Sequence, residues 1–135
     1  MKRYLSLWVL VACLLTGTLL CACRATPALT PAGGYEQISQ QAAKELMDTQ
    51  TNYVILDVRT QEEYDLGHIP GAILIPNEVI QEEAEATLAD KEQLILVYCR
   101  SGRRSKEAAQ KLVDLGYTNV KEFGGIIDWP YQTTR

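Results

Sequence analysis

Residues 94–105 have the sequence Leu-Ile-Leu-Val-Tyr-Cys-Arg-Ser-Gly-Arg-Arg-Ser, in which an apolar run meets a short basic loop. The continuous run from Leu94 to Tyr98 predicts a buried parallel strand, and helical spacing of apolar residues begins near Ser105. Cys99 therefore lies between a strand and a helix, where loop N–H groups and the helix dipole favour negative charge. The neighbouring arginines favour it further. Because the thiolate is the nucleophilic form, we interpret Cys99 as a reactive sulfur.

The rest of the chain alternates between strand and helix patterns. Apolar runs predict strands at 53–58, 72–75 and 119–123, and apolar spacing or composition predicts helices at 38–47, 77–88 and 105–115. Ser39 is a candidate N-cap, and Thr60 with Glu63 forms a capping box for a short helix that ends at Gly67. Continuous strands separated by helices indicate an α/β domain with a mainly parallel sheet. Ligands bind beyond the carboxyl ends of such strands, where Asp57 and Cys99 both lie.

The first 22 residues have the composition of a targeting segment. Lys2 and Arg3 precede an apolar run over residues 5–22, which is interrupted only by small or weakly polar residues. A basic start, an apolar core and small residues at the end are the plan of a secretory signal. The sequence therefore predicts a signal peptide over residues 1–22.

The end of this run, Leu20-Cys21-Ala22-Cys23, resembles a bacterial lipoprotein cleavage box. It predicts a lipid on Cys23, whereas a second box would place the lipid on Cys13 and leave a shorter apolar core. An uncleaved membrane anchor and soluble secretion are the alternatives, since the run approaches the ~20 residues that span a bilayer. Each of these interpretations places the folded domain outside the cytoplasm.

Residues 23–34 contain two prolines and two glycines without apolar periodicity, which predicts a flexible tether before a folded domain over 35–135. Loss of Lys2 and Arg3 with the signal lowers the basic count from 13 to 11 against 17 acidic residues, a net charge of −6. This charge argues against nucleic acid or an anionic membrane surface as a partner. We expect membrane contact only through the N-terminal lipid or anchor.

The remaining cysteines leave Cys99 without a partner for a disulfide bond. Cys13 and Cys21 would be removed with the signal, and Cys23 would be acylated. A single cysteine in an oxidising compartment is either inert and buried or reactive. The arginine-rich loop favours the reactive interpretation.

Several motifs together resemble the rhodanese family of sulfurtransferases. In chain order they are LDVR at 56–59, EY at 63–64, GHIPGA at 67–72, VYCRSGRRS at 97–105, LGY at 115–117, and GG at 124–125 followed by Trp129. The resemblance extends over about residues 35–129. It implies a single rhodanese-like domain, with a parallel five-stranded sheet and helices on both faces.

The resemblance also implies the chemistry of the site. The Cys99 thiolate would take the outer sulfur of a thiosulfate-like donor and form a persulfide, and cyanide or a thiol would then accept that sulfur. The implied substrate-binding residues follow the cysteine directly: Arg100, Ser101, Gly102, Arg103, Arg104 and Ser105. We expect Arg100 and Arg104 to bind the anionic donor, with Arg103 directed either to the donor or to solvent. No metal or organic cofactor is expected.

Two other functions use similar residues. Thiol phosphatases and arsenate reductases have a Cys-x5-Arg loop that holds a tetrahedral anion, whereas Cys99 and Arg104 are separated by four residues. A rhodanese-like domain can also act as a non-catalytic binding or sensor module, although such domains often lack the cysteine. The intact basic loop favours sulfur transfer over both.

Four side chains outside the loop have alternative roles. Asp57 and Arg59 either support the loop and donor or form a structural ion pair at the end of a strand. His68, the only histidine, is expected to have a structural role in a turn rather than to act as a base for Cys99. Trp129 is expected to pack in the core.

Overall fold

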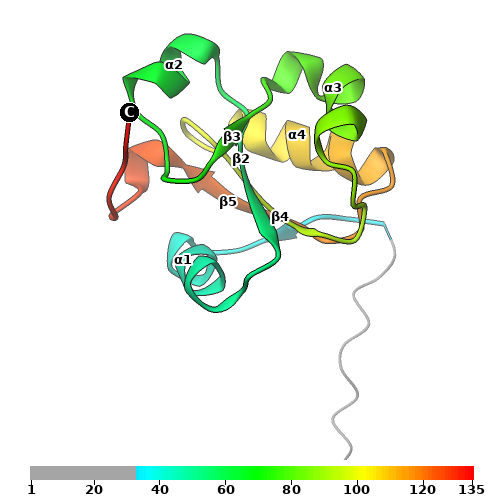
Figure 1. Ribbon diagram of the computed structural model, residues 1–135, viewed down its shortest axis with the longest axis horizontal. Helices are drawn as coiled ribbons and strands as arrows, with labels where there is room; N and C mark the ends of the chain where they lie inside the picture. Colours follow the sequence, from blue (N-terminus) through cyan, green and yellow to red (C-terminus); the bar gives the residue numbers. More distant parts are fainter. Residues whose placement is uncertain (1–32) are drawn as a thin grey trace, which may run out of the picture. The chain divides into compact units, whose positions relative to one another are not determined.

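The computed structural model describes residues 33–135 (Figure 1). The predicted signal peptide over 1–22, both candidate lipidation sites, Cys13 and Cys23, and most of the tether at 23–34 lie outside the described residues. The elements in chain order are β1 (Glu36–Gln37), α1 (Gln40–Thr49), β2 (Tyr53–Asp57), α2 (Gln61–Leu66), β3 (Ile73–Leu74), the 3₁₀ turn η1 (Asn77–Val79), α3 (Ile80–Thr87), β4 (Leu94–Cys99), α4 (Arg103–Asp114), β5 (Val120–Gly125) and the 3₁₀ turn η2 (Ile126–Asp128).

The five strands form one parallel sheet in the order β1-β5-β4-β2-β3. All six residues of the central strand β4 are buried, which explains why its sequence is continuously apolar. Helices α3 and α4 cover one face of the sheet, and α1 covers the other (Figure 1). The predicted α/β class, with a parallel five-stranded sheet and helices on both faces, is confirmed.

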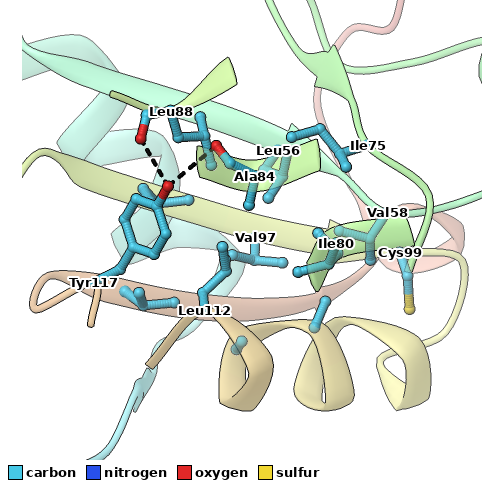
Figure 2. Packing of buried hydrophobic residues seen from close by; sticks show 14 residues of the cluster. Leu56, Val58, Ile75, Ile80, Ala84, Leu88, Val97, Cys99, Leu112 and Tyr117 are labelled. Carbon is cyan, nitrogen blue, oxygen red and sulfur yellow. Dashed lines mark hydrogen bonds between the residues drawn. The ribbon is translucent and has the colours of Figure 1, made fainter. Parts of the chain in front are cut away.

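An apolar cluster fills each face of the sheet. Figure 2 shows the α4-side cluster, in which the Tyr117 hydroxyl bonds to the carbonyls of Ala84 and Leu88 and so connects the segment between α4 and β5 to the end of α3. Its buried members are Leu56, Val58, Ile75, Ile80, Ala84, Leu88, Ile95, Val97, Cys99, Ala108, Ala109, Leu112, Tyr117 and Val120. The α1-side cluster consists of Ala43, Ile55, Ile69, Ala72, Leu94, Leu96, Tyr98, Phe123 and Trp129. Trp129 therefore packs in the core, as expected.

The local sequence signals correctly place the helix ends. The Ser39 side chain accepts from the N–H of Ala42, which makes it the N-cap of α1. Thr60 and Glu63 form both bonds of the capping box at the start of α2. Gly116 follows α4 with a φ of 92°, a conformation that favours glycine after a helix.

The structure differs from the predicted elements in three places. The fifth strand, β1, was not located because its two residues are exposed and have no apolar pattern. The helix predicted to begin near Ser105 begins at Arg103, since Gly102 adopts a left-handed conformation that ends the loop earlier. The helix predicted over 77–88 is divided into η1 and α3. Within residues 33–135, no helix is both long and apolar enough to cross a membrane.

A buried polar network connects β2, β4 and the turn before β3. The Arg59 Nη2 atom lies 2.6 Å from a carboxylate oxygen of Asp57, and both side chains are buried. The Tyr98 hydroxyl donates to the same Asp57 oxygen at 2.7 Å and accepts from the N–H of Ile69 at 3.1 Å. Burial and the negative charge of Asp57 raise the pKa of Tyr98, so the hydroxyl stays protonated. Asp57 and Arg59 thus form an ion pair at the end of a strand.

The Tyr98→Phe substitution should destabilise the domain because the buried Ile69 N–H would lose its acceptor, and the Asp57 oxygen would lose one of its three donors. We expect the free energy of unfolding in urea to fall by about 2 kcal/mol, the typical cost of an unsatisfied buried polar group. Tyr131→Phe is the matched control, since Tyr131 is exposed and should change stability by less than about 0.5 kcal/mol. An equal loss in the two variants would contradict a special role for the Tyr98 hydroxyl.

Candidate active site

Cys99 ends β4 at the carboxyl edge of the sheet, and its thiol is the free cysteine of the described region. Its sulfur lies at one end of the α4-side cluster, next to the first turn of α4 (Figure 2). The residue is only 1% exposed, but its surroundings are polar on the loop side. The N–H of Gly102 donates to Sγ at 3.1 Å, and Sγ contacts the Ser105 hydroxyl at 3.5 Å.

Two glycines allow the loop to fold back over the sulfur. Gly102 has a φ of 100°, in the left-handed region that side chains rarely adopt, and this turn directs its N–H at Sγ. Gly125 lies directly beneath the loop, where an added Cβ would be 2.2 Å from the Arg100 carbonyl oxygen and 2.5 Å from the Ser101 Cα. The loop can therefore approach β5 only because position 125 has no side chain.

Opposing influences act on the ionisation of Cys99. Burial is the largest of them and disfavours the thiolate, but hydrogen bonds from the Ser105 hydroxyl and from backbone N–H groups favour it. The N–H groups belong to Ser105, Gly102 and Ser101, and together with the hydroxyl they lower the pKa of Cys99 below its ordinary value. The loop thus increases the fraction of the nucleophilic form.

The three arginines of the loop have different surroundings. Arg104 forms two hydrogen bonds with the Glu63 carboxylate, at 2.7 and 2.9 Å, which connect α4 to α2. This pairing is the main reason that the pKa of Glu63 is lowered to about 2. The side chain of Arg103 is 75% exposed and pairs with Glu107 on the same helix. It is directed to solvent, which answers the question left open by the sequence.

Arg100 differs from the other two because its guanidinium makes no hydrogen bond or ion pair within residues 33–135. It lines a cleft of about 620 Å³ at the carboxyl edge of the sheet. The cleft also contacts the exposed side chains of Leu66 and Ile127. Its complete lining is Arg59, Glu63, Leu66, Gly67, Arg100, Ile126, Ile127 and Thr133. The unpaired charge of Arg100 is therefore available to an anion in this cleft.

The remaining sequence candidates lie beside the loop rather than against the sulfur. Asp57 and Arg59 bond to each other, and Arg59 also donates to the Gly67 carbonyl at 2.8 Å. The His68 ring stacks on Tyr64, and its backbone pairs with Thr134. His68 therefore contacts its own turn and the end of the chain. Within residues 33–135, no group of three His, Cys, Asp or Glu side chains is arranged to hold a metal ion.

Two residues of the site were not identified from the sequence. Glu63 was recognised only as part of a capping box, yet its carboxylate also binds Arg104 from 41 positions away. The local pattern around Glu122 on β5 predicts no role for it, although it is 3% exposed and accepts from the Ser105 hydroxyl at 2.6 Å. A carboxylate at a core-facing strand position was the available signal, but its partner could not be read from spacing.

Comparison with known proteins identifies the class to which this fold and loop belong. The family model of the rhodanese-like domain matches residues 39–130, and the chain belongs to that family. Its relatives include curated sulfurtransferases.

The chain is 40% identical over 73 residues to the thiosulfate sulfurtransferase PspE of Escherichia coli, covering 54% of this chain and 70% of that protein. It is 41% identical over 96 residues to the thiosulfate sulfurtransferase GlpE of Coxiella burnetii, covering 70% of this chain and 87% of that protein. A solved structure described as a rhodanese with anions from E. coli superimposes with a TM-score of 0.58 at 35% identity, covering 62% of this chain and 98% of that chain.

Replacing Gly125→Ala should disrupt the loop, because the new methyl group would overlap the backbone at Arg100 and Ser101. We expect the free energy of unfolding to fall by about 3 kcal/mol, the upper range for overpacking. The pH midpoint of Cys99 alkylation by iodoacetamide should rise as the loop amides move away from the sulfur. Gly34→Ala is the control, since no atom lies within 4 Å of its added Cβ. Normal stability and alkylation of Gly125→Ala would show that the loop has room to move.

Proposed function

We propose that this chain is a thiosulfate sulfurtransferase that carries sulfane sulfur as a persulfide on Cys99. The observation that carries the proposal is the position of Sγ, which the Gly102 N–H contacts at 3.1 Å inside a loop with a lowered thiol pKa. Membership of the rhodanese-like family and the two thiosulfate sulfurtransferases among its relatives support the same chemistry.

The reaction consists of two sulfur transfers. In the first, the Cys99 thiolate attacks the outer sulfur of thiosulfate, the S–S bond of the donor breaks, and sulfite leaves with the bonding electron pair. In the second, cyanide or a thiolate attacks the outer sulfur of the persulfide, and Cys99 leaves as the thiolate. The loop N–H groups stabilise the negative sulfur before the first step and after the second.

Arg100 is the side chain best placed to bind the donor. Its guanidinium is unpaired within residues 33–135, lies in the cleft beside the loop and can offer paired N–H donors to sulfonate oxygens. Arg104, which the sequence also suggested, instead binds Glu63. We therefore assign it to holding α2 against the loop, with Arg100 as the contact for the anion.

The state of Arg104 also weakens the proposal of a phosphatase or arsenate reductase. Such enzymes need a guanidinium directed at the tetrahedral anion, but here both terminal nitrogens bond to the Glu63 carboxylate. The loop between Cys99 and Arg104 is also one residue shorter than Cys-x5-Arg. A non-catalytic binding module has no use for a thiol whose pKa is lowered by its loop.

We further propose that the domain functions outside the cytoplasm of a bacterium, attached to the membrane by a lipid on Cys23. The basis is the sequence alone: Lys2 and Arg3, the apolar run over 5–22 and the cleavage box at 20–23. The tether at 23–34 would separate the anchor from the domain.

Sulfurtransferase activity is tested by mixing the purified protein with thiosulfate and cyanide and measuring thiocyanate. We expect ping-pong kinetics for the parent protein and no activity above background for Cys99→Ser, since the hydroxyl is a far weaker nucleophile than the thiolate. Arg100→Ala should raise the KM for thiosulfate about tenfold, the value of one charge-assisted contact. Absence of thiocyanate from the parent protein, or equal rates with Cys99→Ser, would refute the proposal.

Mass spectrometry of the protein purified from its native membrane tests the persulfide and the anchor separately. After incubation with thiosulfate, the peptide that contains Cys99 should gain about 32 Da, the mass of one sulfur atom, and lose it on addition of cyanide. The N-terminal residue should be Cys23 with a diacylglyceryl group. Lipid on Cys13 would move the cleavage site, and an intact N-terminus without lipid would overturn the lipoprotein assignment.

A further inference from the structure

Glu122 is a carboxylate in the apolar core next to Cys99. It pairs in register with Val97 of β4 and lies two residues after Val120, on the same face of β5, and both valines belong to the α4-side cluster. Its side chain therefore faces α4 at a position where the strand pattern calls for an apolar residue. A buried carboxylate is costly unless hydrogen bonds satisfy it.

One oxygen of this carboxylate receives two hydrogen bonds. Oε1 accepts from the Ser105 hydroxyl at 2.6 Å and from the N–H of Gly124 at 2.8 Å. The short hydroxyl contact is of the charge-assisted kind, which is about twice as strong as a bond between neutral groups. Glu122 thus binds both the Ser105 side chain of α4, which contacts the sulfur, and the backbone of Gly124 near the end of β5.

Ser105 lies between this carboxylate and the sulfur, and its hydroxyl has only one proton to donate. When that proton is directed to Glu122, Ser105 can only accept from the S–H group of Cys99, at the observed 3.5 Å. This arrangement favours the thiol. When the proton turns to the sulfur, Ser105 becomes a donor that favours the thiolate. The carbonyls of Gly102 and Gly124 also lie within reach of the hydroxyl, at 3.1 and 3.4 Å, but Glu122 is the nearest acceptor, at 2.6 Å. Glu122 is therefore the main competitor of the sulfur for this one proton.

We propose that Glu122 is a positioning residue that sets the thiol–thiolate balance of Cys99 by holding the Ser105 hydroxyl proton away from the sulfur. The loop N–H groups then stabilise the thiolate throughout, and the hydroxyl adds its hydrogen bond only when its proton turns to the sulfur. The proposal rests on the proposed function only for its catalytic consequence, because the balance itself is a property of the resting protein.

The catalytic consequence concerns both half-reactions. A thiolate of higher pKa is a better nucleophile toward the donor, whereas a thiolate of lower pKa is a better leaving group when the acceptor removes the sulfur. While the hydroxyl bonds to Glu122, Cys99 remains a good nucleophile toward the donor. When the acceptor removes the outer sulfur and negative charge returns to Cys99, the hydroxyl can turn to the sulfur and make Cys99 a better leaving group. We call the pH at which half of Cys99 is ionised its midpoint. If Glu122 is replaced by a neutral residue and the midpoint falls, attack on the donor should become slower at a pH above the midpoint, by about threefold for each pH unit of the shift.

Other charges near Cys99 do not offer the same control. The other charged groups on the surrounding elements are Arg103, Arg104, Lys106, Glu107, Lys111 and Asp114 on α4, Asp57 at the end of β2 and Arg59 after it, Glu36 on β1, Lys121 on β5, and Arg100 in the loop. Several of them are held in ion pairs with one another or with Glu63. Among the bonds within residues 33–135, only the Ser105 hydroxyl contacts both the sulfur and a carboxylate.

The test is the pH dependence of Cys99 alkylation by iodoacetamide in the full chain, followed on the peptide that contains Cys99. Glu122→Gln should lower the midpoint by about one pH unit, equivalent to about tenfold more thiolate below both midpoints. In a Ser105→Ala background the same substitution should shift the midpoint by less than about 0.3 units, since the shared hydroxyl is gone. Glu36→Gln, an exposed carboxylate on β1, is the matched control and should leave the midpoint unchanged.

An unchanged or raised midpoint in Glu122→Gln would overturn the proposal, because a residue that merely braces the loop would act in that direction. A shift that persists in the Ser105→Ala background would also overturn it and would assign the effect to charge alone. Should Glu122→Gln fail to fold, Glu122→Asp is the second variant. Its shorter side chain keeps the charge but places the carboxylate farther from Ser105, so the midpoint of Cys99 alkylation should also fall. The alkylation result does not depend on thiocyanate formation, so failure of the proposed function would be seen separately.

Discussion

The site depends on the close approach of the loop backbone to Gly125. Because an added Cβ there would lie 2.2 Å from the Arg100 carbonyl oxygen, the loop and β5 share space that no side chain can occupy. This contact fixes the path of residues 100–102 and brings the Gly102 N–H to within 3.1 Å of the sulfur. It also brings β5 close enough for Glu122 to reach Ser105. The packing of the backbone at Gly125 therefore determines which N–H groups and which carboxylate can act on Cys99.

Much of the fold could be predicted from the sequence because its decisive signals are local. The continuous run at 94–98 corresponds to a strand that is buried on both faces, and the capping residues Ser39 and Thr60 bond within a few positions. The motifs of the loop and turns were sufficient to indicate the family. In contrast, β1 has neither length nor apolar pattern, and it exists only because β5 offers an edge with which it can pair.

The parts of the site that could not be predicted are those made by distant partners. Nothing in the spacing of Glu63 shows that it will bind Arg104, since the capping box already accounts for its presence. In the same way, Glu122 resembles an ordinary strand residue until the fold places it beneath α4. Local patterns identify which residues can react, whereas tertiary contacts decide which of them are already engaged. That is why Arg104 was expected to hold the donor and is found holding a helix.

The pairing of the arginines has a consequence for how substrates reach the cleft. Of Arg59, Arg100, Arg103 and Arg104, three are neutralised by Asp57, Glu107 and Glu63 within the described part of the chain. The field that these four residues project into solvent is therefore that of about one positive charge, which salt screens within about 8 Å at physiological ionic strength. Encounter with an anion should then depend little on ionic strength. On the proposed function, an anion would be selected only at contact with the loop amides and the Arg100 guanidinium. Three arginines of the four contribute little attraction at a distance, because each is already paired.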